Sequence, residues 1–365
     1  MKVAVLMDSF KGSMTSLEAG NAVRAGILTA CPDAEVTVLP LADGGEGTVD
    51  SISSFIGGIE KRLTVTGPLG RPVEAQYILV PSRKTAYIEM AKAAGLTLLN
   101  EDERDPYITT TYGVGELIKD AIASGAESLV KCIGGSATND GGAGMLQALG
   151  ARFLDKDGKE IVRGAEGLKD LCSADLAGLI DSSLCITVAS DVTNPLCGPD
   201  GCSFVYGPQK GASPKACEEM DSWLKNYADI CGFDPFEPGT GAAGGMSFAL
   251  KNFLGANVVS GADLVMEITG AEAVIRGCDI VVTGEGRIDG QTLNGKGPFR
   301  IMELGRSCGK KVLGFCGITG DGYEKCLSAG FDRIVPLIRP SMVTSEAVKS
   351  MEETAARVFS GADVL

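Results

Sequence analysis

Two short polar segments of this 365-residue sequence carry the residue types that phosphate chemistry needs. Segment 8–13 reads DSFKGS and segment 284–290 reads GEGRIDG. Lysine and arginine can pair with a phosphate or a carboxylate, and carboxylates can hold Mg²⁺ or accept a proton. A plain turn with an aspartate cap explains the first segment equally well when it is taken alone. The candidates in the two segments are Asp8, Ser9, Lys11, Glu285, Arg287 and Asp289.

A glycine-rich run at 134–144 (GGSATNDGGAG) offers a second kind of site. Closely spaced backbone N–H groups with little side-chain bulk can form a concave site for an anion. The run is therefore predicted to cradle phosphate groups, and a purely structural turn is the alternative. The residues assigned to this contact are Gly134, Gly135, Ser136, Thr138 and Asn139.

Three other loops each carry one candidate. Asp43 opens a loop rich in glycine and acid, and a helix start rich in acid is its alternative interpretation. Asp191 follows an apolar run and could act as a base, although an Asx-turn before Asn-Pro fits as well. Lys210 lies between glycines and a proline, where it could contact a phosphate or simply be an exposed turn lysine.

The sequence contains no histidine, and this absence limits the available chemistry. Ser-His-Asp and Cys-His catalysis are excluded, as are zinc and haem sites with histidine ligands. A general base must therefore be Asp, Glu, Lys, Tyr or Cys. The formal charge of −14 argues against a nucleic-acid partner, because no basic stripe is available to neutralise phosphates.

Two partial motif matches point to other nucleotide sites, and both are weak. Segment 239–244 matches G-x-G-x-x-G, but no predicted strand precedes it, as a dinucleotide site would require. Segment 290–296 matches most of a P-loop, but Gly297 stands where Ser or Thr should hold Mg²⁺. A phosphate contact from Lys296 remains part of the prediction.

Short, buried strands alternating with helices predict a parallel, doubly wound sheet that positions these loops. Thr15 and Glu18 form a capping box that opens a helix running to about Ala30. If the strands take the order 2-1-3-4-5, the switch point lies between strands 2–7 and 279–283, and ligands bind outside the carboxyl ends there. The five predicted strands are 2–7, 35–39, 279–283, 310–316 and 333–337.

The wide gap between the second and third of these strands predicts an α/β domain interrupted by an inserted one. We expect a discontinuous domain formed by 1–62 plus 256–365 and an inserted α/β domain at 63–255. The strands expected in the insert are 62–66, 74–80, 85–90, 128–133, 150–154 and 185–190.

Cysteine usage and hydropathy predict a cytoplasmic protein. The twelve cysteines include no C-x-x-C pair and lie mostly in apolar runs, which is typical of buried, reduced thiols. The first residues carry no signal-peptide pattern, and no apolar run approaches the 18 residues of a membrane span.

Taken together, the polar segments resemble the glycerate kinase family, and the resemblance spans the whole chain in family order. Met7 and Met14 depart from residues that are frequent in that family, without affecting the chemistry. The resembling segments are DSFKGS (8–13), LADGGEGT (41–48), GPLGRPV (67–73), IEMAKAAGL (88–96), IGGSATNDGGAG (133–144), SDVTNPLCGPDG (190–201), YGPQKGA (206–212), GTGAAGG (239–245) and TGEGRIDGQTLNGKGP (283–298).

The resemblance implies transfer of the γ-phosphoryl group of ATP to D-glycerate with Mg²⁺, giving 2-phospho-D-glycerate in this branch of the family. It also implies a flavodoxin-like domain, an inserted α/β domain and an active cleft between them. The small-molecule partners would be ATP and D-glycerate, with neither nucleic acid nor membrane, and a homo-oligomer is compatible with the sequence.

Phosphoryl transfer needs positioning and charge neutralisation more than covalent chemistry. Asp191 is therefore the hypothesised base for the substrate hydroxyl. Lys11, with Arg71 or Arg287, would hold the substrate carboxylate or the transferring phosphoryl group. The metal ligands would be Glu285 and Asp289, with Asp43. The other substrate or phosphate contacts would come from Asp8, Ser9, Lys210, Lys296 and the glycine-rich run.

Two functions from other classes compete with the kinase. A nicotinamide-dependent dehydrogenase would rest on segment 239–244, and binding of NADH would support it. A non-catalytic sensor of small acids would bind D-glycerate without releasing ADP from ATP.

Overall fold

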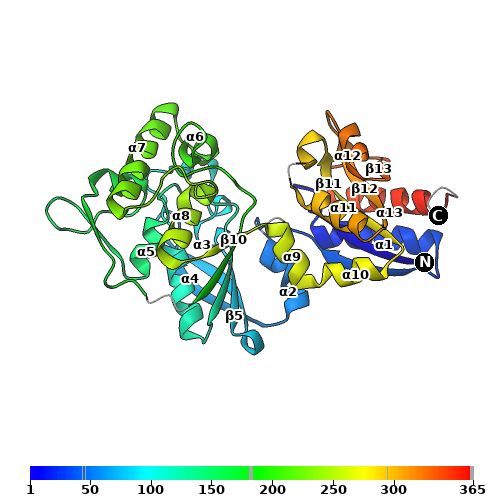
Figure 1. Ribbon diagram of the computed structural model, residues 1–365, viewed down its shortest axis with the longest axis horizontal. Coiled ribbons are helices and arrows are strands. Elements are labelled where there is room, and N and C mark those ends of the chain that lie inside the picture. The colour runs from blue at the N-terminus through cyan, green and yellow to red at the C-terminus, as the bar shows by residue number, and fades with distance from the viewer. Residues whose placement is uncertain (43, 46, 181–183, 294, 362–365) are drawn as a thin grey trace. The chain divides into compact units, whose positions relative to one another are not determined.

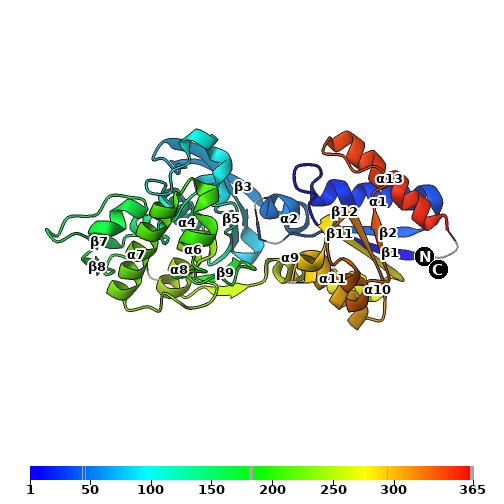
Figure 2. The ribbon, with the colours of Figure 1, turned by 90° about the horizontal axis from the view of Figure 1, so that it is seen from above.

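The computed structural model describes residues 1–42, 44–45, 47–180, 184–293 and 295–361. The chain splits into two compact units. The first comprises Met1–Asp43, Asp50–Ile56 and Ala262–Leu365, and the second comprises Gly44–Val49 and Gly57–Gly261. The blue start and the yellow-to-red end of the chain form the first unit, and the cyan-to-green middle forms the second (Figure 1 and Figure 2).

The first unit is built on a five-stranded sheet whose order is β13-β12-β11-β1-β2. All neighbouring strands are parallel. This arrangement confirms the expected 2-1-3-4-5 order and places the switch point between β1 and β11. The strands are β1 (Lys2–Met7), β2 (Glu35–Pro40), β11 (Ile280–Ile288), β12 (Lys311–Thr319) and β13 (Arg333–Pro336).

Helices cover both faces of this sheet, which explains why its central strands β1, β11 and β12 contain continuous buried runs. Helices α1 (Ser16–Ala30) and α13 (Thr344–Phe359) pack on one face. The other face carries α9 (Gly261–Thr269), α10 (Ala271–Gly277), α11 (Gly297–Ser307) and α12 (Glu324–Ala329). The predicted capping box is confirmed, because Thr15 and Glu18 bond reciprocally at the start of α1.

A close helix contact in this unit depends on one glycine. A Cβ at Gly26 of α1 would lie 2.3 Å from the carbonyl oxygen of Glu352 in α13. Only a residue without a side chain lets the two helices approach so closely.

The second unit is built on a six-stranded sheet whose order is β10-β9-β6-β5-β4-β3. Strands β3, β4 and β5 pair antiparallel, and β5, β6, β9 and β10 pair parallel. The strands are β3 (Ile59–Thr66), β4 (Pro72–Val80), β5 (Thr85–Glu89), β6 (Ser128–Cys132), β9 (Cys185–Ala189) and β10 (Asn257–Val259).

Three short strands differ from the sequence-based expectation. β7 (Arg152–Leu154) forms a two-stranded sheet with β8 (Ser173–Asp175) and does not join the main sheet. Neither β8 nor β10 was expected, because three residues are too few to show an alternating pattern. The expected boundary at 255/256 leaves β10 outside the insert although it pairs with β9, and the boundary at 62/63 falls inside β3.

One extensive hydrophobic core joins the helices of the second unit to its sheet. Within it, the Tyr227 ring meets Phe153 edge-on, with ring centroids 5.4 Å apart. The helices are α3 (Ala91–Ala94), α4 (Tyr112–Ala123), α5 (Ala143–Ala148), α6 (Cys202–Tyr206), α7 (Pro214–Cys231) and α8 (Ala242–Leu254), while α2 (Thr48–Ile56) begins within this unit and continues into the first.

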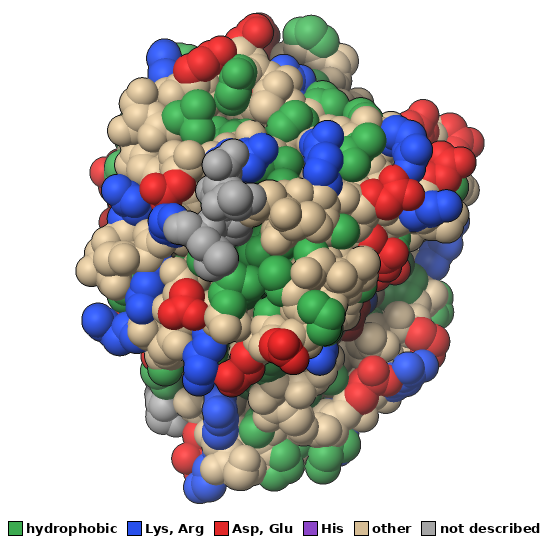
Figure 3. Space-filling model, turned by 90° about the vertical axis from the view of Figure 1, so that its right-hand side faces the viewer, with side chains coloured by type: hydrophobic (Ala, Val, Ile, Leu, Met, Phe, Trp, Pro, Cys, Tyr) green, Lys and Arg blue, Asp and Glu red, His purple; other side chains and the backbone are tan. Residues whose placement is uncertain are grey.

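The described surface and helices bear on the expectations drawn from charge and hydropathy. On the face of the molecule in Figure 3, Lys and Arg side chains are interspersed with Asp and Glu, and neither sign forms a continuous patch. None of the helices in the described ranges is long and apolar enough to cross a membrane. All twelve cysteines are free thiols, and most of them are buried or half-buried.

Candidate active site

The switch point of the first unit brings the two polar segments together. The backbone N–H of Asp8, directly after β1, donates to the carbonyl oxygen of Gly284 in β11 at 2.8 Å. Further along β11, a Cβ at Gly286 would lie 3.6 Å from the Cα of Phe10. Segment 8–13 therefore runs alongside the last residues of β11, at the sheet edge where ligands of such folds bind.

Strand β11 is longer than expected, which corrects the placement of two candidates. Glu285 and Arg287 lie in the strand, where they pair with Cys316 and Ile318 of β12, and not in a loop after it. The apolar pattern ends at Thr283, but backbone pairing does not require apolar side chains. These two charged residues are thus held by a strand ladder, which is more rigid than a loop.

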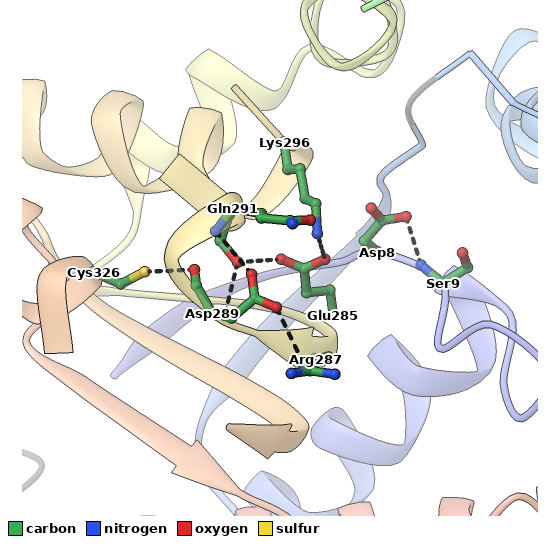
Figure 4. A network of polar contacts seen from close by, with 9 residues as sticks. Asp8, Ser9, Glu285, Arg287, Asp289, Gln291, Lys296 and Cys326 are labelled. Carbon is green, nitrogen blue, oxygen red and sulfur yellow. Dashed lines mark hydrogen bonds and ion pairs between the residues drawn. The ribbon is translucent and has the colours of Figure 1, made fainter. Parts of the chain in front are cut away.

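Glu285 is the most enclosed carboxylate of this edge, with 8% of its surface exposed. Its Oε1 accepts a hydrogen bond from the Thr292 hydroxyl at 2.8 Å, and its Oε2 accepts one from Lys296 Nζ at 3.2 Å (Figure 4). Burial raises the pKa of Glu285, and the Thr292 and Lys296 contacts oppose part of that rise. The two donors favour the ionised carboxylate.

Asp289 lies one residue after β11 and is held by its own turn. Its Oδ1 accepts from the backbone N–H of Gln291 at 2.8 Å, and its Oδ2 forms an ion pair with Arg287 Nε at 3.2 Å (Figure 4). The Arg287 side chain is 59% exposed, so most of its guanidinium remains available to a ligand.

The segment after β1 adds another carboxylate and another cation. Asp8 accepts a hydrogen bond from the backbone N–H of Ser9 at 2.6 Å. A Cβ at Gly297, the first residue of α11, would lie 3.6 Å from Oδ2 of Asp8. Lys11 is exposed and makes no hydrogen bond or ion pair with the rest of the described chain. Lys11, Arg287 and Lys296 can therefore supply positive charge at this edge.

The second unit gathers its candidates at the carboxyl ends of its parallel strands. Asp191 is exposed and follows β9. After β6, the N–H of Gly134 donates to the carbonyl oxygen of Gly44 at 3.3 Å. Gly44 also lies against the end of β9, because a Cβ there would be 2.8 Å from the carbonyl oxygen of Ala189. Three loops thus converge at one edge of this sheet.

Only the start of the glycine-rich run is open to a ligand. Gly135 is exposed and Gly134 half-buried, whereas Ser136 is 6% exposed. Thr138 and Asn139, expected to contact phosphate, are fully buried. The reason for the difference is that this part of the run passes beneath the surface, where its side chains contact the protein itself.

Lys210 lies in the same interior and not in an exposed turn. It is 1% exposed, and its Nζ donates to the carbonyl oxygen of Thr138 at 2.6 Å. The amide of Asn139 donates to the Ser203 hydroxyl at 2.8 Å. In this structure Lys210, Thr138 and Asn139 support the glycine-rich run from inside.

Asp140 is a residue that the sequence did not single out. It is fully buried and accepts from Thr111 N at 2.9 Å, Thr111 Oγ1 at 2.8 Å, Gly142 N at 3.1 Å and Gly144 N at 3.3 Å. Burial raises its pKa, against the effect of these donors. Its signal in the sequence is an aspartate directly before two glycines, where a carboxylate can bind the following N–H groups.

Arg71 lies in the turn that joins β3 and β4. Its side chain is 70% exposed, and its Nη1 forms an ion pair with Glu103 at 2.8 Å. Since β3 and β5 both run antiparallel to β4, the turn after β3 lies at the same edge of the sheet as the carboxyl end of β5. Arg71 therefore belongs to the edge that carries Asp191.

Both partial motif matches are poor nucleotide sites in the structure. No strand precedes segment 239–244, and residues 243–245 have left-handed backbone angles inside α8. Segment 290–296 begins with a 3₁₀ turn, Gly290–Leu293, and ends at Lys296, the N-cap of α11. The dinucleotide and P-loop interpretations thus lack their structural context.

Asp43 lies outside the described residues, and its predicted part in metal binding stays a prediction. Across the described ranges, no group of three or more His, Cys, Asp or Glu side chains is arranged to hold a metal ion. Glu285 and Asp289 are carboxylates of the kind that Mg²⁺ uses when substrate phosphates and water complete its shell.

A doubly wound α/β unit binds small ligands at its switch point, and the cations and carboxylates there suit an enzyme with anionic substrates. The family model described as "Glycerate kinase family" matches residues 3–361. The chain belongs to the glycerate kinase family, and it is a kinase.

Individual relatives cover nearly the whole chain. It is 43% identical to "Glycerate kinase" of Bacillus subtilis, over 97% of this chain and 96% of the relative. It is 42% identical to "Glycerate 2-kinase" of Escherichia coli, over 98% of this chain and 96% of the relative. A crystal structure of a protein assigned as glycerate kinase 2 from Salmonella typhimurium LT2 has a TM-score of 0.87 and 41% identity, covering 100% of this chain and 98% of that one.

Proposed function

We propose that this enzyme transfers the γ-phosphoryl group of ATP to D-glycerate, with Mg²⁺, and releases ADP and 2-phospho-D-glycerate. The observation that carries the proposal is the 42% identity with the Escherichia coli "Glycerate 2-kinase" over almost the full length of both chains. The cations and carboxylates at the switch point support it, since phosphoryl transfer depends on charge neutralisation.

In the first unit, cations would hold anionic groups of the substrates. Lys11 is exposed, and Arg287 is mostly exposed, so both can approach a carboxylate or a phosphoryl group. Lys296 is 41% exposed and pairs with Glu285, from which it could move to a phosphate. Asp8 and Ser9 would complete the contacts of this edge through their polar side chains.

Glu285 and Asp289 would hold Mg²⁺, directly or through water, with Asp43 as a further proposed ligand. When bound, the ion would neutralise charge on the transferring phosphoryl group. The residues fit this part, because magnesium in kinases needs only one or two carboxylates beside the phosphates of the nucleotide.

In the second unit, Asp191 would accept the proton of the substrate hydroxyl. Its exposure after β9 leaves the carboxylate within reach of a small molecule. Gly134 and Gly135, with Ser136, would contact phosphate, and Arg71 would offer a further cation. Thr138, Asn139 and Lys210 would act by holding the glycine-rich run in place.

The function is tested by a coupled assay of ADP release from ATP on addition of D-glycerate. We expect release that requires both D-glycerate and Mg²⁺, and a rate no higher than the glycerate-free background would overturn the kinase proposal. NMR of the product then tests the position of transfer. Coupling of phosphorus to the single C2 proton is expected, and coupling to the two C3 protons would overturn the 2-phosphate.

A further inference from the structure

A buried hydroxyl connects the carboxylate of Glu285 to the backbone of Asp289, the two candidate metal-binding residues of the first unit. Thr292 is fully buried in the 3₁₀ turn that follows Asp289. Its Oγ1 donates to Glu285 Oε1 at 2.8 Å and accepts from the backbone N–H of Asp289 at 3.2 Å. One hydroxyl thus donates to the carboxylate of Glu285 and accepts from the backbone of Asp289.

The turn that carries this hydroxyl is held on several sides. The N–H of Thr292 donates to the carbonyl oxygen of Asp289 at 3.0 Å, and Gly290 N donates to Asp321 O at 2.9 Å. The same Asp289 carbonyl accepts from Cys326 Sγ at 3.4 Å (Figure 4). Because the turn is bonded to its surroundings, the position of the Thr292 hydroxyl is set before any ligand binds.

The two oxygens of Glu285 have partners of different character. Oε1 contacts Thr292, a short, β-branched side chain with few rotamers. Oε2 contacts Lys296, a long side chain that is 41% exposed. The first partner cannot leave without breaking the turn, whereas the second can rotate away into solvent.

We propose that the Thr292 hydroxyl is a positioning group that holds Oε1 of Glu285 in place. The orientation of the carboxylate is then fixed when Oε2 releases Lys296 and binds a ligand. Lys296 would then turn to an anionic group of that ligand. The proposal rests on the proposed function of this edge as the site of phosphoryl transfer.

The first test replaces Thr292 with valine, which keeps the shape and removes the hydroxyl. Misplacing an active carboxylate should lower kcat by about tenfold or more. We expect KM for ATP and D-glycerate to change less than about threefold, since the cations proposed to hold the anionic groups of both substrates are unchanged. Thr292→Ser retains the hydroxyl and should recover most of the activity. If Thr292→Val does not fold, Thr292→Ala removes the same group without adding bulk.

Thr283 supplies a matched control on the same strand. It is fully buried, and its Oγ1 has no hydrogen-bond partner among the described residues. Thr283→Val therefore removes a buried hydroxyl two positions from Glu285 without breaking a bond. We expect its kinetics to match those of the parent enzyme. An equal loss in Thr283→Val and Thr292→Val would overturn the proposal, as would near-parental kcat in Thr292→Val.

A double-mutant cycle separates positioning from general structural support. Glu285→Gln should lower kcat strongly, and adding Thr292→Val should cause little further loss, because the hydroxyl acts through the carboxylate. Losses that multiply would overturn the proposal, and so would full activity in Glu285→Gln. Failure of the proposed function has a different signature, namely no glycerate-dependent ADP release in the parent enzyme.

Discussion

The two sheet edges carry their polar residues in opposite ways. At the switch point of the first unit, Glu285 and Asp289 contact cations that are partly or mostly exposed, Lys296 and Arg287. At the edge of the second unit, Asp191 and Gly135 are exposed, but the residues that shape the neighbouring run are buried. The first edge presents charged side chains to a ligand. The second edge presents the backbone of the glycine-rich run, which buried side chains hold in place.

This difference shows that a polar residue near a site can have one of two roles. It can contact a ligand at the surface, or it can hold the site's backbone in place from the protein interior. A charged side chain at the surface can change its partner when a ligand arrives, at little cost. A polar side chain in the interior loses a bond that nothing replaces, and that loss is expensive. Substitutions at the first edge should therefore change kinetics, and those beneath the second edge should change stability.

Asp191→Asn is expected to give the largest effect. If Asp191 accepts the substrate proton, kcat should fall by about 10²- to 10⁴-fold with little change in the thermal midpoint. Steady-state kinetics in the ADP-release assay would measure it. Asp200→Asn, at an exposed aspartate of the same unit, is the matched control and should behave like the parent. Near-parental kcat in Asp191→Asn would contradict the proposal that Asp191 accepts the substrate proton.

The parallel sheet of the first unit was predictable from the sequence because its central strands β1, β11 and β12 contain runs that are buried on both faces. Val3 and Val5 pack on one side of β1 while Ala4 and Leu6 pack on the other, so the whole segment is apolar. The continuation of β11 through Arg287 was not predictable, because its pairing with β12 uses backbone groups that no side-chain pattern reveals.

Polar residues were harder to place than strands. In the glycine-rich run, Gly135 and Asn139 look alike in the sequence as sites for an anion, yet one is exposed and the other fully buried. The direction of such a side chain depends on partners far along the chain, such as Ser203 for Asn139. Thr292 was not singled out for the same reason, since its importance comes from a contact with Glu285.

Lys11→Ala tests the first edge and should have the next largest effect. Loss of a cation that neutralises a phosphoryl group should lower kcat by about 10²- to 10³-fold, with folding preserved because the side chain is exposed. Kinetics and a thermal melt of the same preparation would check both parts. Lys349→Ala, at an exposed lysine of α13, should leave both unchanged. A change confined to thermal stability in Lys11→Ala would instead favour a structural part for this segment.

Lys210→Met tests the interior support of the second edge. The substitution leaves the Thr138 carbonyl without its donor, which should lower the free energy of unfolding by about 1–3 kcal/mol. Denaturant unfolding would measure the loss. An unchanged stability with a large fall in kcat would indicate that Lys210 contacts a substrate, and the contrast between the two edges would fail.

Lys131→Met is the smallest and sharpest test, because it makes the same substitution at a lysine without an acceptor. Lys131 lies fully buried in β6, between Ile88 of β5 and Val188 of β9, and within the described chain its Nζ has no hydrogen-bond partner. No bond is lost on substitution and a buried amine is removed, so stability should stay unchanged or rise by about 1 kcal/mol.

Its pH dependence supplies an independent readout. Burial lowers the pKa of Lys131 to about 7, below the value of about 10.4 for a free lysine. Between these values the unfolded chain binds the proton and the folded chain does not, so this residue makes stability rise with pH. The slope should flatten in Lys131→Met when unfolding is measured from pH 7 to pH 10. An unchanged slope would mean that the Lys131 ammonium has a hydrogen-bond partner in the folded protein. Lys131 would then stabilise the fold in the same way as Lys210.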